Sequence, residues 1–224
     1  MDIKKLFIQS NGYNIPSILI EPPESSGIVI IIHGYGGSKE EQLGSGWRIS
    51  LSGFTSCLID LPGHGENTDY FDGDIKSYID SVIDYFNGNS NIIVMGHSVG
   101  GRLALLSKAN YVIGISPTLV KDFSNETKSF IKNIRSYRVR ELSDDFLWEL
   151  HRQLPVFDFS GRKNALIIFG SRDVPEIYNS CKKIQKYPAN VFEIDKALHN
   201  DIFLNEKTFE IIINQLKHLK NNIN

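Results

Sequence analysis

Ser98 is the residue whose sequence surroundings point most directly to chemistry. It lies in the stretch GHSVGG, after an apolar run and before a helix-like pattern. Where G-x-S-x-G joins a strand to a helix, the turn is so tight that the positions two before and two after the serine must be small. Gly96 and Gly100 occupy them, and the serine oxygen then projects above the sheet as a nucleophile. The alternative is a glycine-rich turn that only permits close packing.

The same glycines do not match the known phosphate-binding loops. A P-loop requires G-x-x-x-x-G-K-[ST], whereas Arg102 and Leu103 follow Gly101. The dinucleotide fingerprint G-x-G-x-x-G is absent from this stretch. We therefore interpret the glycines as the frame of a nucleophilic turn, which needs a base elsewhere in the chain because a serine hydroxyl alone is a poor nucleophile.

His199 is the histidine best placed to act as that base. It lies in the stretch ALHND, after the last predicted strand and before the final helix. This position predicts it at the carboxyl edge of the sheet, on the same side as Ser98. The other five histidines lie in turn motifs or in predicted helices: His33, His64, His97, His151 and His218.

Asp173 is the predicted acid that orients the base. It ends a strand in the stretch GSRDVP, so it also emerges at the carboxyl edge of the sheet. A carboxylate on the far side of the imidazole holds the required tautomer and stabilises the imidazolium. Asp195 and Asp201 are rival acids, and Asp173 has the alternative role of a helix N-cap. The order serine, aspartate, histidine is the order found in α/β hydrolases.

Acyl transfer also needs hydrogen-bond donors for the developing oxyanion. The stretch HGYGGS follows a central apolar strand, and its glycines allow backbone N–H groups to turn toward the serine. We predict the backbone N–H groups of Tyr35 and Val99 as the oxyanion hole. The alternative is again a tight strand-to-helix turn.

The hydrophobic pattern predicts the scaffold that must position these residues. Two runs joined at Asn11-Gly12 predict a leading hairpin. GIVIIIHG is apolar at both odd and even positions, as is typical of a parallel strand buried on both faces. The other predicted strands are 54–61, 91–96, 111–116, 164–170 and 190–195. The predicted helices are one opened by a capping box of Ser38 and Glu41, then 74–86 with Asp74 as N-cap, 99–109, 125–137, 143–154, 175–186 and 205–219.

This alternation predicts an α/β fold, with an eight-stranded, mostly parallel sheet and helices on both faces. We expect residues 1–224 to form a single domain. Residues from about 118 to 161 interrupt the pattern with two helices after the sixth strand. An insertion at the carboxyl end of a strand predicts a small helical cap over the ligand crevice.

Composition excludes several functional classes. The 224 residues are 41% hydrophobic and 22% charged, and the formal net charge of -2 gives no strong attraction to nucleic acid or to an anionic membrane. The longest apolar run is too short to span a bilayer, and the first residues do not resemble a signal peptide. The two cysteines form no metal-ligand cluster. We expect a cytoplasmic protein with no cofactor, no metal, no nucleic-acid partner and no stable membrane anchor; the oligomeric state stays open.

Five stretches in chain order carry a resemblance to a known family: HGYGGS, DLPGHGEN, GHSVGG, GSRDVP and ALHND. The chain resembles an α/β-hydrolase fold protein, of the small serine esterase or monoacylglycerol-lipase kind, over nearly its whole length. The resemblance implies an eight-stranded sheet whose second strand is antiparallel. It also implies that four residues of the second stretch are structural: Asp60, Gly63, His64 and Gly65. A serine at position 98 disfavours dehalogenases and epoxide hydrolases, which use aspartate there.

The leading hypothesis is a serine carboxylesterase that cleaves small-molecule esters of small to medium acyl chains through an acyl-enzyme intermediate. The first alternative is an acyl thioesterase with the same triad; Arg135, Arg138 and Arg140 would then contact an acidic substrate, or belong to a mixed solvated surface. The second is a catalytically idle domain for ligand sensing or protein interaction. Apolar side chains of the insertion either line an acyl pocket or pack the cap onto the core: Phe123, Phe130, Phe146, Leu147 and Trp148.

Overall fold

The strands form one eight-stranded sheet in the order β1-β2-β4-β3-β5-β6-β7-β8. The computed structural model describes residues 1–88, 91–158, 162, 164–185 and 190–221. The strands are β1 (Asp2–Ser10), β2 (Tyr13–Glu21), β3 (Ile28–Ile32), β4 (Thr55–Ile59), β5 (Ile92–His97), β6 (Tyr111–Ile115), β7 (Ala165–Arg172) and β8 (Asn190–Leu198). β2 pairs antiparallel with β1 and β4, and the other pairs are parallel. The predicted α/β fold with a mostly parallel sheet is confirmed.

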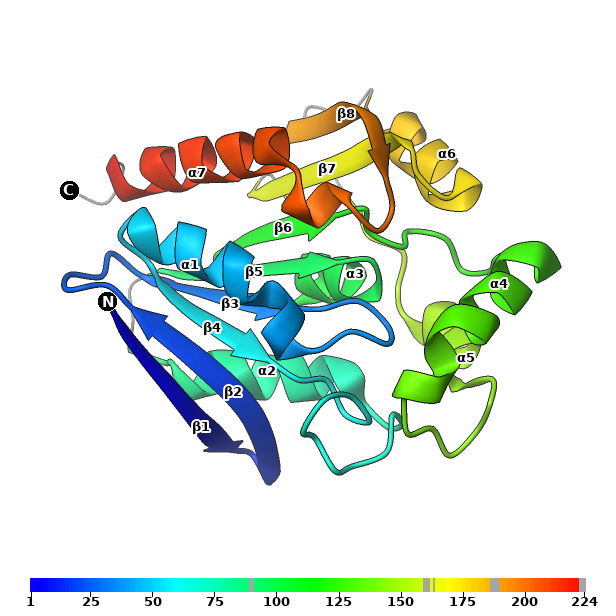
Figure 1. The fold of residues 1–224 in the computed structure, drawn as a ribbon, viewed down its shortest axis with the longest axis horizontal. Helices are drawn as coiled ribbons and strands as arrows, with labels where there is room; N and C mark the ends of the chain where they lie inside the picture. Colours follow the sequence, from blue (N-terminus) through cyan, green and yellow to red (C-terminus); the bar gives the residue numbers. More distant parts are fainter. Residues whose placement is uncertain (89–90, 159–161, 163, 186–189, 222–224) are drawn as a thin grey trace.

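Helices cover both faces of this sheet (Figure 1). They are η1 (Lys39–Gln42), α1 (Leu43–Leu51), α2 (Ile75–Tyr85), α3 (Val99–Leu106), α4 (Asn125–Arg135), η2 (Ser136–Arg138), α5 (Phe146–Gln153), α6 (Pro175–Ile184), η3 (Ile202–Leu204) and α7 (Glu206–Asn221). Alternate side chains of β3 pack into two different hydrophobic cores, one on each face of the sheet, because successive side chains of a strand point to opposite faces. Ile30 and Ile32 pack with α2 and α3, whereas Val29 and Ile31 pack with α1 and α7.

The leading hairpin turns at the predicted residues. Asn11 and Gly12 both have positive φ, 49° and 85°, as a two-residue turn that follows the strand twist requires. Asp74 caps α2 as predicted, since its side chain accepts a hydrogen bond from the Ser77 N–H. The predicted capping box at Ser38 is wrong, because Ser38 precedes a 3-10 helix and its side chain makes no cap hydrogen bond. The following N–H, that of Lys39, donates instead to Asp60.

Two helices of the chain segment between β6 and β7, α4 and α5, lie beyond the carboxyl end of the parallel strands (Figure 1). This is the helical insertion that the sequence predicts. The end of the predicted range, residues 159–161, lies outside the described residues. No helix in the described part of the chain is long and apolar enough to cross a membrane.

Arg102, in the middle of α3, forms hydrogen bonds to the chain at both ends of the helical insertion. Its side chain is 1% exposed, and among the described residues it has no carboxylate partner. One guanidinium nitrogen donates to the carbonyls of Thr118 and Val120, at 3.2 and 2.6 Å. The other donates to the carbonyls of Leu154 and Pro155, at 2.8 and 3.3 Å. Burial lowers the pKa of Arg102 to about 10, which leaves it charged at neutral pH.

We predict that Arg102→Met loosens the cap. The variant keeps the bulk of the side chain but leaves four carbonyls, two of them at buried bonds, without their donor, so we expect a loss of about 2–4 kcal/mol in the free energy of unfolding. Denaturant unfolding measures this loss, and hydrogen exchange should rise in α4 and α5. Arg162, which donates to three carbonyls at the other end of α3, provides the matched control Arg162→Met. Equal exchange in α4 for both variants would contradict the role of Arg102.

Candidate active site

Ser98 occupies a strained turn between β5 and α3. Its φ and ψ are 58° and -121°, and the left-handed region is costly for a residue with a Cβ. The turn leaves no room beside it: a Cβ on Gly96 would lie 2.3 Å from the Gly100 carbonyl oxygen. A Cβ on Gly100 would lie 2.3 Å from the His33 carbonyl oxygen. The backbone N–H of Ser98 donates to the Ile115 carbonyl on β6 at 2.9 Å, which secures the turn against the sheet.

The structure brings the three predicted side chains into one hydrogen-bonded chain. His199 follows β8, and its Nε2 lies 3.0 Å from the Ser98 Oγ. Asp173 follows β7, and its Oδ1 lies 2.8 Å from the His199 Nδ1. The carboxylate can only accept, so Nδ1–H donates to Asp173 and Nε2 is left to accept the hydroxyl proton of Ser98. This is the arrangement in which an imidazole can act as a general base toward a serine.

The carboxylate of Asp173 is enclosed by donors. Its side chain is fully buried, the Val174 N–H donates to Oδ1 at 2.7 Å, and the Ser116 hydroxyl donates to Oδ2. Burial alone would raise its pKa, but the hydrogen bond and charge of His199, with those two donors, hold the pKa of Asp173 below its usual range. The sequence analysis did not predict the role of Ser116, which directly follows β6 and has a φ of 45°. Its position at the end of the strand that pairs with β7 could have indicated that it lies near Asp173.

The rival acids lie elsewhere. Asp195 receives a long hydrogen bond of 3.5 Å from the Ser171 hydroxyl. Asp201 accepts from the backbone N–H of Leu198 at 2.8 Å. Among the described residues, neither carboxylate contacts the imidazole of His199.

The predicted oxyanion donors border Ser98. A Cβ on Gly34 would lie 3.2 Å from the Ser98 Cβ, so the HGYGGS loop passes directly beside the serine. Among the described residues the Tyr35 N–H has no acceptor. Val99 is the first residue of α3, and its N–H therefore lacks an intrahelical acceptor. Both residues line the same cavity as Ser98, and both N–H groups are available for an oxyanion.

Two buried histidines, His97 and His33, form hydrogen bonds to the backbone around the site. The Nε2 of His97 lies 2.8 Å from the backbone carbonyl of His199 and donates to it, which holds the loop that carries His199. Burial lowers the pKa of His97 to about 3, with a smaller contribution from His199. His33 accepts from the Leu61 N–H through Nε2, and burial lowers its pKa to about 4. We expected turn geometry to explain these two residues; His97 also positions His199.

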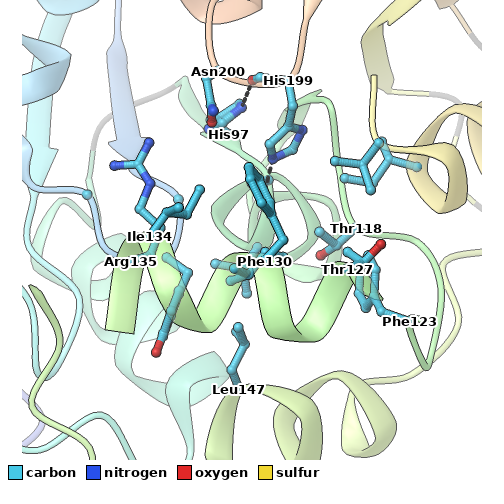
Figure 2. A pocket seen from close by; sticks show the side chains of 18 of the residues that line it. His97, Thr118, Phe123, Thr127, Phe130, Ile134, Arg135, Leu147, His199 and Asn200 are labelled. Carbon is cyan, nitrogen blue, oxygen red and sulfur yellow. Dashed lines mark hydrogen bonds between the residues drawn. The ribbon is translucent and has the colours of Figure 1, made fainter. Parts of the chain in front are cut away.

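A cavity of about 440 Å³ opens above Ser98 and His199. Its far wall is formed by α4 and α5, and Figure 2 shows the Phe130 side chain directed toward His199. On one side of Phe130 lie Phe123, Thr118 and Thr127; on the other lie Ile134 and Arg135 (Figure 2). The apolar lining residue Phe123 and the charged lining residue Arg135 thus lie on opposite sides of Phe130 (Figure 2).

The structure divides the residues singled out in the insertion. Four of the five apolar ones line the cavity: Phe123, Phe130, Leu147 and Trp148. The fifth, Phe146, instead packs edge to face on Phe71 with ring centroids 5.0 Å apart. Of the arginines, Arg138 pairs with Glu41 at 2.6 Å and Arg140 donates to backbone carbonyls, whereas Arg135 lines the cavity. Among the described residues no group of histidine, cysteine and acidic side chains is arranged to hold a metal.

Comparisons with known proteins agree with this geometry. A model described as "Alpha/beta hydrolase family" matches residues 29–181. No curated protein sequence matches significantly. Est1E from Butyrivibrio proteoclasticus, solved with ferulic acid bound, superposes with a TM-score of 0.72 at 20% identity and 96% and 97% coverage of this chain and that one.

Two further solved structures show the same fold. A soluble variant of monoglyceride lipase from Saccharomyces cerevisiae, in complex with a substrate analogue, has a TM-score of 0.66 at 14% identity, with 98% of this chain and 95% of that one covered. A thioesterase domain from the curacin biosynthetic pathway has a TM-score of 0.63 at 16% identity, with 95% and 99% covered. At these identities the likeness concerns the fold alone.

The buried histidines predict a protein that is sensitive to mild acid. Burial lowers the pKa of His64 from 6.5 to about 3, so between these values the unfolded chain binds a proton that the folded chain does not. The free energy of unfolding therefore falls as pH falls below about 6, by about 1.4 kcal/mol per pH unit for each such histidine. In urea unfolding between pH 6 and 4, His64→Phe should reduce this pH dependence of the free energy of unfolding by about 1.4 kcal/mol per pH unit. The exposed His218 supplies the control His218→Gln, and an equal slope reduction in both variants would contradict the assignment.

Proposed function

The chain belongs to the alpha/beta hydrolase family, and from that premise we propose that it is a serine hydrolase that cleaves carboxylic esters of small to medium acyl chains. The observation that carries the proposal is the hydrogen-bonded chain from Asp173 through His199 to Ser98, placed at the wall of an apolar cavity. In this proposal residues 1–224 act as one catalytic domain, with the insertion from about 118 to 161 as its cap.

The geometry supports the following reaction. His199 takes the proton of Ser98 as the serine oxygen attacks the ester carbonyl, and Asp173 stabilises the imidazolium. The N–H groups of Tyr35 and Val99 hold the oxyanion, each worth roughly 2.7–4 kcal/mol of barrier height. His199 then protonates the leaving alcohol. A water activated by the same imidazole attacks the acyl-enzyme, and the acid leaves with Ser98 restored.

The size and lining of the cavity support the substrate class. A volume of about 440 Å³ is within the usual range for sites that bind small molecules. The lining of the cavity includes the apolar side chains of Phe123, Leu147 and Trp148, which suit the hydrocarbon of an acyl group. Est1E, whose structure holds ferulic acid, and the monoglyceride lipase make small-molecule esters the natural substrates to test first.

The alternatives have less support. Thioester hydrolysis would use the same three residues, but two of the three arginines that favoured an acidic thioester are engaged within the protein, Arg138 by Glu41 and Arg140 by the Asn67 carbonyl. A catalytically idle domain would be favoured by an imidazole turned away from the serine. The Nε2 of His199 lies within hydrogen-bond distance of Ser98 instead.

The first prediction of the proposal concerns Ser98. A fluorophosphonate probe should label the wild-type protein, and Ser98→Ala should abolish both labelling and p-nitrophenyl butyrate hydrolysis, since both adducts would form on the Ser98 oxygen. Ser107→Ala, at the far end of α3, is the matched control that keeps both. Retained turnover in Ser98→Ala would rule out Ser98 as the nucleophile. Comparison of butyryl-coenzyme A with the p-nitrophenyl ester separates thioesterase from esterase.

The second prediction identifies the acid. Asp173→Asn removes the carboxylate that fixes the tautomer of His199, and kcat should fall by up to about 10⁴-fold while the fold is retained. Asp195→Asn makes the same carboxylate-to-amide change on β8, the strand beside β7. It should leave kcat unaltered, because Asp195 contacts Ser171 and not the imidazole. The reverse pattern would make Asp195 the acid.

A further inference from the structure

Among the described residues, Arg135 is the one arginine that lines the cavity above Ser98. It lies where the end of α4 meets the HGYGGS loop, residues 33–38. It is the last residue of α4 and is partly buried. A Cβ on Gly36 would lie 2.9 Å from the Arg135 Cβ, so the two backbones are in direct contact there. Gly36 has a φ of 69° and no side chain, which allows this approach. The arginine is therefore positioned by the same loop that carries Tyr35.

The guanidinium of Arg135 has no protein partner in the described structure. Neither a hydrogen bond nor an ion pair engages it among these residues, whereas its neighbour Arg138 pairs with Glu41 at 2.6 Å. In Figure 2 the guanidinium points from α4 toward the side of the cavity where His97 and Asn200 lie. Burial lowers the pKa of His97, and the charge of Arg135 acts on it in the same direction, which agrees with this closeness.

The acidic residues of the cavity do not neutralise this charge. Glu41 is engaged by Arg138. Glu126 also lines the cavity, but it lies in the first turn of α4, nine residues before Arg135. At 1.5 Å per residue the two positions are about 13 Å apart along the helix. The lining is thus positive at Arg135, whereas Phe123 and Glu126 make it apolar and acidic on the other side of Phe130.

We propose that Arg135 is an anion-binding subsite for the substrate, and that the ester cleaved at Ser98 bears a carboxylate or phosphate group which this guanidinium receives. The inference rests on the proposed function, which it makes more specific. A guanidinium binds such groups through two parallel N–H donors, and partial burial strengthens the interaction relative to an exposed charge. The Asn200 amide, on the same side of the cavity, is a second available donor (Figure 2).

Two matched pairs of esters test the subsite. In the first pair the charge is on the acyl part: p-nitrophenyl hydrogen glutarate against p-nitrophenyl methyl glutarate. In the second it is on the leaving group: 4-carboxyphenyl butyrate against 4-(methoxycarbonyl)phenyl butyrate. The measured quantity is the ratio of kcat/KM for the charged member to that for the neutral member, because this ratio cancels any general loss of activity.

Arg135→Gln should lower that ratio about tenfold to hundredfold in one of the two pairs, the range expected for a lost charged hydrogen bond. The loss should fall on KM, since a remote charge is bound equally in the ground and transition states. Arg152→Gln, at an exposed position of α5 outside the cavity lining, is the matched control and should keep the wild-type ratio. The pair that responds identifies whether the acyl or the alcohol part carries the anion. An unaltered ratio in both pairs overturns the subsite and leaves ester hydrolysis standing.

Binding without turnover separates this proposal from the proposed function. The amide analogues 4-butyramidobenzoate and glutaranilate, each with its methyl ester, are titrated calorimetrically into the wild type and both variants. We expect wild-type protein and Arg152→Gln to bind one carboxylate more tightly than its methyl ester, and Arg135→Gln to lose that preference. This result with no ester turnover would refute the hydrolase and keep the anion site. Equal Kd values for the carboxylates in the wild type and Arg135→Gln would refute the anion site.

Discussion

The close contact of three backbone segments around Ser98 is the constraint on which the site depends. Gly100 faces the carbonyl of His33, Gly96 faces the carbonyl of Gly100, and any Cβ there would lie about 2.3 Å from an oxygen. Only glycine permits this approach, and it places the first turn of α3 against the end of β3. The positive φ of Ser98 costs on the order of 1–3 kcal/mol, which the surrounding sheet must offset. The strain and the exposure of the serine oxygen thus have one cause.

A buried ion pair holds the second loop of the site in register with the first. The Lys39 ammonium is fully buried and lies 2.6 Å from the Asp60 carboxylate, which also accepts from the N–H groups of Lys39 and Glu66. Gly65 has positive φ, and a Cβ there would lie 2.4 Å from Asp60. Because an unpaired buried charge is costly, the buried Asp60 depends on Lys39, whose ammonium also lies 2.8 Å from Glu40 and 2.9 Å from Glu66. The motif DLPGHG therefore acts at a distance, by fixing the loop that presents Tyr35.

Local sequence patterns predict the parts of this structure whose causes are local. Apolar runs and strand-to-helix turns suffice for the eight strands and for the order of Ser98, Asp173 and His199 along one sheet edge. The capping box at Ser38 fails because the Glu41 N–H donates to the Ser38 carbonyl in a 3-10 turn, and the Glu41 carboxylate pairs with Arg138, 97 residues away. Ser116 and Arg102 escape notice for the same reason: their partners lie 57 residues away in Asp173 and up to 53 residues away in the cap stem.

The cap and the sheet contribute to the site in different ways. The proposed triad stands at the carboxyl ends of β5, β7 and β8, where the sheet fixes the positions of its side chains. α4 has no buried residue, yet it carries Phe130 and Arg135 into the cavity. Its start is tied to α6 through Glu176, which accepts from the Ser124 N–H, and its end rests on Gly36. A helix held at both ends with so little buried surface can change its inward side chains at small cost in stability. Substrate choice can therefore vary in this fold while the nucleophilic turn stays the same.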